Sequence, residues 1–267
     1  MISCVKEIHS KMNMLTSLSI KNLVLIFALL IGSIIFSLES APPVVAGPSF
    51  PEELSDVILP NHKTLQPFAL YDHNREAFNL DSLKGKWTFL FFGYTHCPEV
   101  CPMALAMLAD LFEILDKDAP QAMEKTHGVF VSVDPLRDTP EDLQQYAPYF
   151  HPEFLGVTGS EKAIKAFTRQ IGALYFFETD FKDPNGKKQV NKDPNGKKQI
   201  KKPDPEEGYS VSHTSAFFLI DPLGRLVAIF PDFNNTDSLF EEYVRIRKFV
   251  KIRNLYGNSE GLSIDTK

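Results

Sequence analysis

Residues 87–102 read WTFLFFGYTHCPEVCP, an apolar run that leads directly into two cysteines four positions apart. The first part, 87–92, is almost wholly apolar, as is typical of a central strand covered on both faces. Pro98 and Pro102 suit the first turn of a helix, where a missing backbone N–H costs nothing. The two cysteines, Cys97 and Cys101, are therefore expected at a strand-to-helix turn.

Strand and helix patterns alternate along the rest of the chain. Further strands are predicted at 66–70, 128–133, 154–157, 214–220 and 226–230, and helices at 102–115, 140–146, 161–171 and 239–252. Ser160 and Ser238 are the expected N-caps of the last two helices, the second with Glu241 as a capping box. This alternation predicts an α/β fold in which helices flank a central mixed sheet.

The cysteine pair is not needed to hold the fold together. The chain has 267 residues, of which 43% are apolar, so it can bury a full core. A disulfide between residues four apart closes a very short loop and removes little entropy from the unfolded chain. The spacing permits either a redox disulfide or the clamping of one soft metal ion, and amides at a helix N-terminus would lower the thiol pKa. Two inert, buried thiols are the remaining alternative.

Two thiolates rarely complete a metal site, so a third ligand is expected. His213 stands out because it lies at the entry to the apolar run 214–220, whereas His96 has the context of a turn residue. The other histidines of the domain are expected to be solvated: His62, His73, His127 and His151. Met103 and Met107 have, with Leu111, the spacing of a helix core stripe rather than of copper thioethers.

The N-terminal region predicts export. Residues 23–38 read LVLIFALLIGSIIFSL without a charge, and lysines precede them, which places the following residues on the far side of a membrane. The segment is either a single anchor, which we favour, or a cleaved signal peptide, with Ala46 as a conceivable cleavage point. The expected order is a cytoplasmic tail at 1–22, the membrane segment at 23–38, a linker at 39–53, the working domain at 54–253 and a tail at 254–267. The lysine-rich flanks favour a bacterial inner membrane, with the domain in the periplasm.

A tandem repeat interrupts the domain. KDPNGKKQV at 182–190 is followed by KDPNGKKQI at 192–200. Asp-Pro-Asn-Gly favours a turn, so 182–202 is predicted to be a basic surface loop inserted into the domain. The loop is expected to be a duplicated surface segment without a function of its own. The alternative is that its positive charge steers an acidic partner toward the domain.

Four ordered motifs resemble one known family. They are FFGYTHCPEVCP (91–102), VSVDPLRDTP (131–140), FHPEFLGVTG (150–159) and YSVSHTSAFFLIDPLG (209–224). Together they are similar to the Sco/SenC family of thioredoxin-like, membrane-anchored copper proteins that help to assemble the binuclear copper centre of cytochrome c oxidase. The resemblance implies that Cys97, Cys101 and His213 bind Cu(I) or Cu(II), and that the cysteines also cycle between dithiol and disulfide.

The resemblance also leaves choices open. It implies either a copper metallochaperone, whose partners are the copper-receiving oxidase subunit and another periplasmic copper donor, or a thiol-disulfide reductase that prepares that subunit. A thioredoxin-like peroxidase is disfavoured, because a proline-flanked pair replaces the usual lone cysteine. Asp134 is expected either near the site or in a turn cap, and Arg137 with Asp138 in a loop ion pair. Many family members carry an aspartate where this chain has Ser212, which predicts a change in the tautomer or Cu(II) affinity of the histidine.

Overall fold

The computed structural model describes residues 54–178, 209–231 and 235–260, which all belong to a compact unit running from Pro48 to Lys267. Within them, one mixed sheet has the strand order β1-β10-β9-β4-β5-β6-β2-β3. Strands β4, β5 and β6 are parallel, and the other neighbours are antiparallel. The strands are β1 (Ile58–Thr64), β2 (Ala69–Asp72), β3 (Ala77–Asn79), β4 (Trp87–Gly93), β5 (Thr126–Ser132), β6 (Leu155–Thr158), β9 (Phe217–Ile220) and β10 (Arg225–Phe230).

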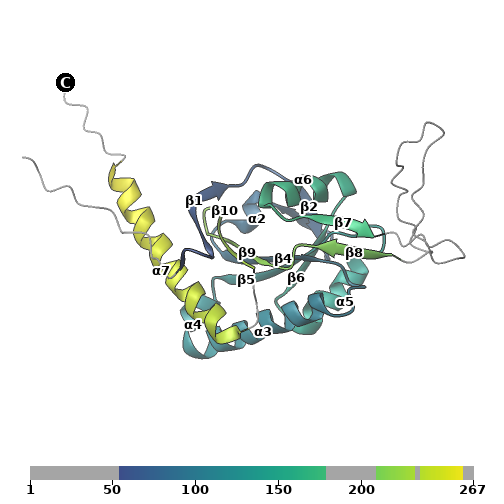
Figure 1. The fold of residues 1–267 in the computed structure, drawn as a ribbon, viewed down its shortest axis with the longest axis horizontal. Helices are drawn as coiled ribbons and strands as arrows, with labels where there is room; N and C mark the ends of the chain where they lie inside the picture. Colours follow the sequence, from purple (N-terminus) through teal and green to yellow (C-terminus); the bar gives the residue numbers. More distant parts are fainter. Residues whose placement is uncertain (1–53, 179–208, 232–234, 261–267) are drawn as a thin grey trace, which may run out of the picture. The chain divides into compact units, whose positions relative to one another are not determined.

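Helices cover both faces of this sheet (Figure 1). On one face lie α3, α4 and α5, with α7 against α3, and on the other lie α2 and α6. Aromatic contacts from β4 define the two layers: Phe89 packs against Tyr243 of α7, and Phe92 against Phe167 of α6. The helices are α2 (Leu80–Leu83), α3 (Val100–Asp118), α4 (Pro120–Met123), α5 (Pro140–Phe150), α6 (Glu161–Ile171) and α7 (Thr236–Glu260).

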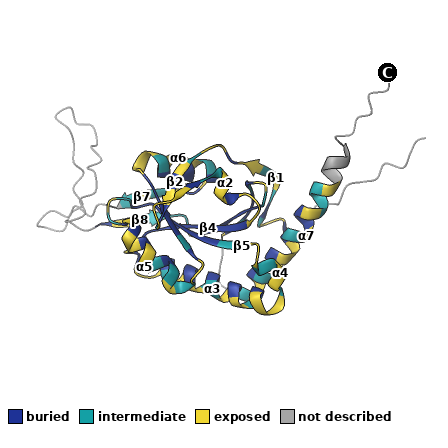
Figure 2. Cartoon of the chain, turned by 180° about the vertical axis from the view of Figure 1, so that it is seen from behind, coloured by how far each residue is buried: buried dark blue, intermediate teal, exposed yellow. Residues whose placement is uncertain are grey.

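Every residue of β4 is buried, as its apolar run predicts. Figure 2 shows the buried residues concentrated in the central strands and on the inner sides of the helices. Strand β4 lies in the middle of the sheet, and Gly93 is its last residue. The buried strand therefore fixes the position of the cysteine turn, which follows at its C-terminal end.

A second, two-stranded sheet lies beside the first. Strands β7 (Tyr175–Glu178) and β8 (Ser210–His213) pair antiparallel, with Tyr175 opposite His213. The strand predicted at 214–220 begins only at Phe217, because Thr214 turns aside and bonds to Leu174: its N–H and its hydroxyl both donate to the Leu174 carbonyl oxygen, at 2.9 and 3.3 Å. His213 therefore ends one strand rather than entering the next.

The predicted mixed sheet and flanking helices are confirmed, and α6 has the predicted bounds with Ser160 as its N-cap. The N-cap predicted at Ser238 is wrong. Helix α7 begins two residues earlier, and the side chain of Asn235 accepts a hydrogen bond from the Ser238 N–H at 3.2 Å. The strand predicted at 66–70 begins at Ala69, since Pro67 has no N–H to donate to a ladder.

Strand β1 was not predicted, because ILPNHKT is mostly polar and contains a proline. It lies at the edge of the sheet, where one side is exposed and a proline is tolerated. The predicted membrane segment at 23–38 and the basic loop at 182–202 lie outside the described residues. No helix among the residues that the structure describes is long and apolar enough to cross a membrane.

Candidate metal centre

The two cysteines lie where β4 ends and α3 begins. Glu99, the residue before α3, makes no side-chain cap, and the Sγ of Cys97 accepts a hydrogen bond from the Cys101 N–H at 3.4 Å instead. Both are free thiols; Cys97 is 9% exposed and Cys101 is fully buried. The Cys97 sulfur thus occupies the anion position at the N-terminus of a 19-residue helix.

Gly93 makes room for this arrangement. A Cβ at this position would lie 2.5 Å from the Cys101 Sγ and 2.8 Å from the Phe130 ring, both closer than atoms can approach. The absence of a side chain at the end of β4 therefore allows the Cys101 sulfur to pack against the sheet.

The two thiols have very different proton affinities. A hydrogen bond from the Cys101 thiol, helped by backbone amides, lowers the pKa of Cys97 from 9.0 to about 4 although burial opposes it. The same hydrogen bond and burial raise the pKa of Cys101 far above its usual range. At neutral pH these opposite shifts of the two pKa values favour the negative charge on Cys97 and the proton on Cys101.

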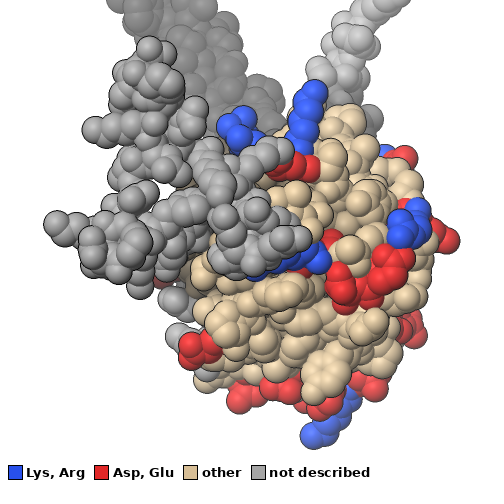
Figure 3. Space-filling view, turned by 90° about the vertical axis from the view of Figure 1, so that its right-hand side faces the viewer, with Lys and Arg blue, Asp and Glu red and all other residues tan. Residues whose placement is uncertain are grey.

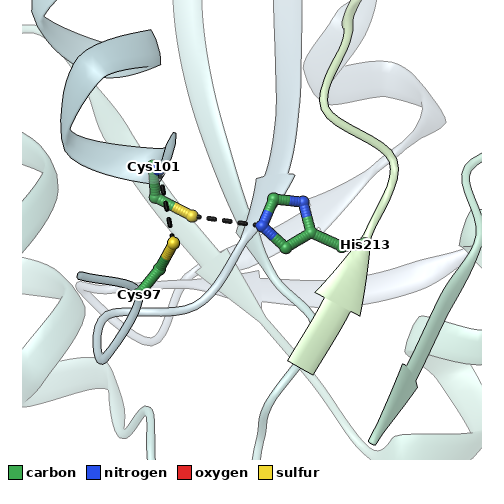
Figure 4. Close-up of side chains that lie close together, drawn as sticks. All are labelled: Cys97, Cys101 and His213. Carbon is green, nitrogen blue, oxygen red and sulfur yellow. Dashed lines mark hydrogen bonds between the residues drawn. The ribbon is translucent and has the colours of Figure 1, made fainter. Parts of the chain in front are cut away.

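His213 points at the cysteines from the end of β8 (Figure 4). Its Nε2 lies 3.4 Å from the Cys101 Sγ, and its Nδ1 lies 3.3 Å from the Thr214 carbonyl oxygen. A carbonyl can only accept, so the contact to Thr214 favours the tautomer with the proton on Nδ1, in which Nε2 presents its lone pair to the sulfurs. The edges of Phe91 and Tyr94 hold the ring, at centroid distances of 5.9 and 6.1 Å.

The three side chains form one cluster of potential ligand atoms. Their two sulfurs and one ring nitrogen lie within 4.8 Å of one another. Two thiols and an imidazole suit a soft or borderline ion such as copper or zinc, and three ligands leave a coordination position open. The fold thus brings His213 to the cysteine pair, although it lies more than 110 positions further along the chain.

Asp138 holds the cysteine turn in place. This buried carboxylate accepts hydrogen bonds from the Thr95 N–H at 3.0 Å, the Thr95 hydroxyl at 2.6 Å and the Ser132 hydroxyl at 2.6 Å. The predicted ion pair of Asp138 with Arg137 is wrong. Arg137 pairs instead with Asp134, whose Oδ2 lies 2.6 Å from its Nε. Both aspartates are fully buried.

The other histidines of the part of the chain that the structure describes have structural positions. His96 is exposed, as a turn residue should be, but the four that were predicted to be solvated are each half-buried. His73, for example, accepts a hydrogen bond from the Gly156 N–H at 3.1 Å, and His151 packs against Phe112. Among the methionines, Met107 lies against the core as predicted, whereas Met103 is 58% exposed.

The side of the domain that carries β7, β8 and α5 is seen in Figure 3. Acidic and basic side chains lie around a broad area without charged groups.

The residue at 212, Ser212, is half-buried and stands opposite Phe176 in the second sheet. The Thr214 carbonyl supplies the orienting contact that an aspartate at 212 was expected to give.

Fold and site together define a thioredoxin-like α/β domain with two cysteines and one histidine grouped as for a metal ion. The chain belongs to the SCO1/SenC family, whose model matches residues 58–248. A SCO2-like protein of Rickettsia felis is 34% identical over 163 residues, which are 61% of this chain and 67% of that protein. A protein of Stutzerimonas stutzeri described as a putative copper-binding protein is 28% identical, over 66% of this chain and 72% of the other.

Solved structures agree with this assignment. The crystal structure of Arabidopsis thaliana ScoI with copper bound has a TM-score of 0.56 and 28% identity, and covers 68% of this chain and 97% of its own. The solution structure of apo Sco1 from Thermus thermophilus has a TM-score of 0.53 and 34% identity, and covers 68% and 91%.

Proposed function

We propose that this protein is a copper metallochaperone that delivers copper to the binuclear centre of cytochrome c oxidase. Cys97, Cys101 and His213 are its ligands, and the copper ion is its cargo. The observation that carries the proposal is the cluster of two sulfurs and an oriented Nε2 within 4.8 Å. Membership of a family that includes copper-bound structures supports copper rather than zinc.

The ligand set suits delivery. Two thiolates are sufficient for Cu(I), and an added imidazole accommodates Cu(II), so one site can hold the ion in both oxidation states. With only three protein ligands, a receiving protein can add its own ligand before the donor releases the ion, which a closed four-ligand site resists.

Copper titration of the purified full-length chain tests this proposal. Cys97→Ser and Cys101→Ser should abolish tight Cu(I) binding, and His213→Ala should weaken Cu(II) binding by more than the about 10- to 100-fold that is typical of losing a partner that only orients a ligand. His96→Ala is the matched control, because it removes an exposed histidine next to Cys97. Equal Cu(II) affinity of the wild type and His213→Ala would exclude the three-ligand site.

A second candidate is a thiol-disulfide reductase that reduces the receiving cysteines of the oxidase subunit. The contrast between Cys97, which carries the charge and is partly accessible, and the fully buried Cys101 favours it, since disulfide exchange needs one attacking and one resolving thiol. Disulfide exchange does not require His213. Oxidase assembly restored in cells by a chain that carries no copper, but not by Cys97→Ser, would select this function over copper delivery.

We also propose that residues 23–38 anchor the protein in a bacterial inner membrane, with 39–53 as a linker and 54–253 as the periplasmic copper-binding domain that carries the loop at 182–202. The apolar run and the lysines before it support this arrangement. Another periplasmic protein would then supply the copper. Extraction of membranes at alkaline pH distinguishes the anchor, which stays with the membrane, from a cleaved signal peptide, which leaves a soluble and shorter chain.

A further inference from the structure

The strand that carries His213 is not part of the main sheet. Among the described residues, β8 pairs only with β7, whereas the cysteine turn follows directly from the buried β4. A two-stranded sheet is marginally stable by itself. Contacts outside its own ladder must therefore fix the distance from the imidazole to the sulfurs.

Tyr209, the residue before β8, makes such contacts. Its hydroxyl donates to Asp134 Oδ1 at 2.6 Å, and its carbonyl oxygen accepts from Arg137 Nη1 at 3.0 Å. The Arg137 guanidinium also covers the Tyr209 ring, 3.7 Å from its centroid. The Asp134 carboxylate joins the two, since it accepts from Arg137 Nε at 2.6 Å as well. The four contacts form a closed network in which each residue touches the other two.

The three residues of the network are largely buried. Asp134 is fully buried, Arg137 is 11% exposed at its side chain and Tyr209 is 9% exposed. Burial and the hydrogen bond to Asp134 raise the pKa of Tyr209, so its hydroxyl keeps its proton and donates. Charge-assisted hydrogen bonds of this kind are about twice as strong as neutral ones.

One short loop thereby connects both halves of the site. Residues 134–138 follow β5; Arg137 holds Tyr209, four positions before His213, while Asp138 holds Thr95, two positions before Cys97. Arg137 also lies over the ring of Tyr94, 5.5 Å from its centroid, and that ring in turn contacts His213.

We propose that Arg137 and Tyr209 are positioning residues that hold β8 so that His213 reaches the metal as third ligand. This inference rests on the proposed function. Because two thiolates retain Cu(I) without the imidazole, loss of either residue should weaken Cu(II) binding selectively. Partners that hydrogen-bond directly to a metal ligand are typically worth about 10- to 100-fold in affinity, so residues that act through the strand carrying the ligand should be worth the lower end of that range.

The test compares Tyr209→Phe and Arg137→Gln in the full-length chain, titrated separately with Cu(II) and Cu(I). Tyr209→Phe keeps the ring and removes only the hydroxyl. We expect about tenfold weaker Cu(II) binding, an altered Cu(II) electron paramagnetic resonance spectrum and Cu(I) affinity within about twofold of the wild type. In the metal-free chain, amide hydrogen exchange should become faster in β8 and stay unchanged in β4.

Two matched controls and one conservative variant complete the design. Tyr149→Phe removes a hydroxyl from a ring that is 82% exposed, and Arg75→Gln breaks an exposed arginine–carboxylate pair, so both should behave as the wild type. Arg137→Lys keeps the charge next to Asp134 and should recover part of the Cu(II) affinity lost in Arg137→Gln. Arg137→Lys also replaces Arg137→Gln as the test variant if Arg137→Gln prevents folding.

The outcomes separate the two proposals. Cu(II) affinity and spectrum unchanged in Tyr209→Phe and Arg137→Gln would overturn the positioning role while leaving the ligand set intact. Equal losses for both copper states, with faster exchange in β4, would overturn it in favour of a general structural role. If His213→Ala itself binds Cu(II) normally, the ligand set fails and the positioning role fails with it.

Discussion

Alkylation of Cys97 in the reduced, metal-free chain should be almost independent of pH between pH 6 and pH 8. With its pKa lowered from 9.0 to about 4, the Cys97 sulfur is already a thiolate at both values. An ordinary cysteine with a pKa of 9.0 gains about tenfold in thiolate per pH unit over the same range. The two pH profiles therefore differ in slope as well as in level.

The expected alkylation rate of Cys97, relative to that of an ordinary cysteine, follows from two opposing effects. A pKa lower by five units reduces the intrinsic nucleophilicity of the thiolate by about 200-fold, for a Brønsted coefficient of about 0.45. For an ordinary cysteine with a pKa of 9.0, the thiolate fraction is about 0.001 at pH 6 and about 0.1 at pH 8. Apart from the effect of burial, which is the same at each pH, Cys97 should react about fivefold faster than the ordinary cysteine at pH 6 and about twentyfold slower at pH 8.

The assay follows iodoacetamide labelling by mass spectrometry in a Cys4→Ser background, with a one-cysteine peptide as reference. Cys101→Ala serves as the control, because it removes the thiol whose hydrogen bond contributes most to the lowered pKa of Cys97. In that variant the labelling rate should regain a dependence on pH. A Cys97 rate that climbs tenfold per unit from pH 6 to pH 8 would refute the assignment of the charge to this sulfur.

Three further predictions concern stability and the shape of the site. Gly93→Ala should displace the Cys101 sulfur, destabilise the fold by about 1–3 kcal/mol and impair copper binding. Gly85→Ala is the control, because this residue has a φ of +79° but no neighbour within 4 Å. Thermal unfolding and copper titration should show that Gly85→Ala affects stability alone. Asp138→Ala should cost about 3 kcal/mol in denaturant unfolding, since it leaves the buried donors of Thr95 and Ser132 without their acceptor; a cost below about 0.5 kcal/mol would contradict the anchoring role. Burial, with Arg225 and Arg253 nearby, lowers the pKa of His62 from 6.5 to about 4, so its neutral form contributes stability that is present above pH 6.5 and is lost as the pH falls toward 4. The loss, about 1–2 kcal/mol after allowance for partial exposure, should be absent in His62→Gln.

Local patterns predicted the elements that place the cysteines. The apolar run of β4 and the helix period of α3 lie wholly within short windows, and both elements have nearly the expected bounds. Edge strand β1 could not be recognised in this way. Its stability comes from pairing with β10 far along the chain, and its own residues are mostly polar.

The ligand cluster and its supports differ in how far the sequence could predict them. Cys97 and Cys101 are close in the chain, and His213 was selected as third ligand with the help of the family resemblance. The partners of Asp138 and Arg137 could not be chosen among many polar residues, because Thr95 and Tyr209 are 43 and 72 positions away. Proximity within the loop suggested an ion pair between Arg137 and Asp138, yet the fold gives each of them another partner.

The hydrogen bond from His213 Nδ1 to the carbonyl oxygen of Thr214 has a consequence for mutational tolerance. Every amino acid supplies a main-chain oxygen, so no substitution at 214 that keeps the backbone path removes the acceptor. A carboxylate at position 212 is therefore not needed to orient the imidazole, and a serine there is compatible with an imidazole that presents Nε2 to the sulfurs. Random mutagenesis of this region should accordingly find position 214 more permissive than position 213 for copper binding.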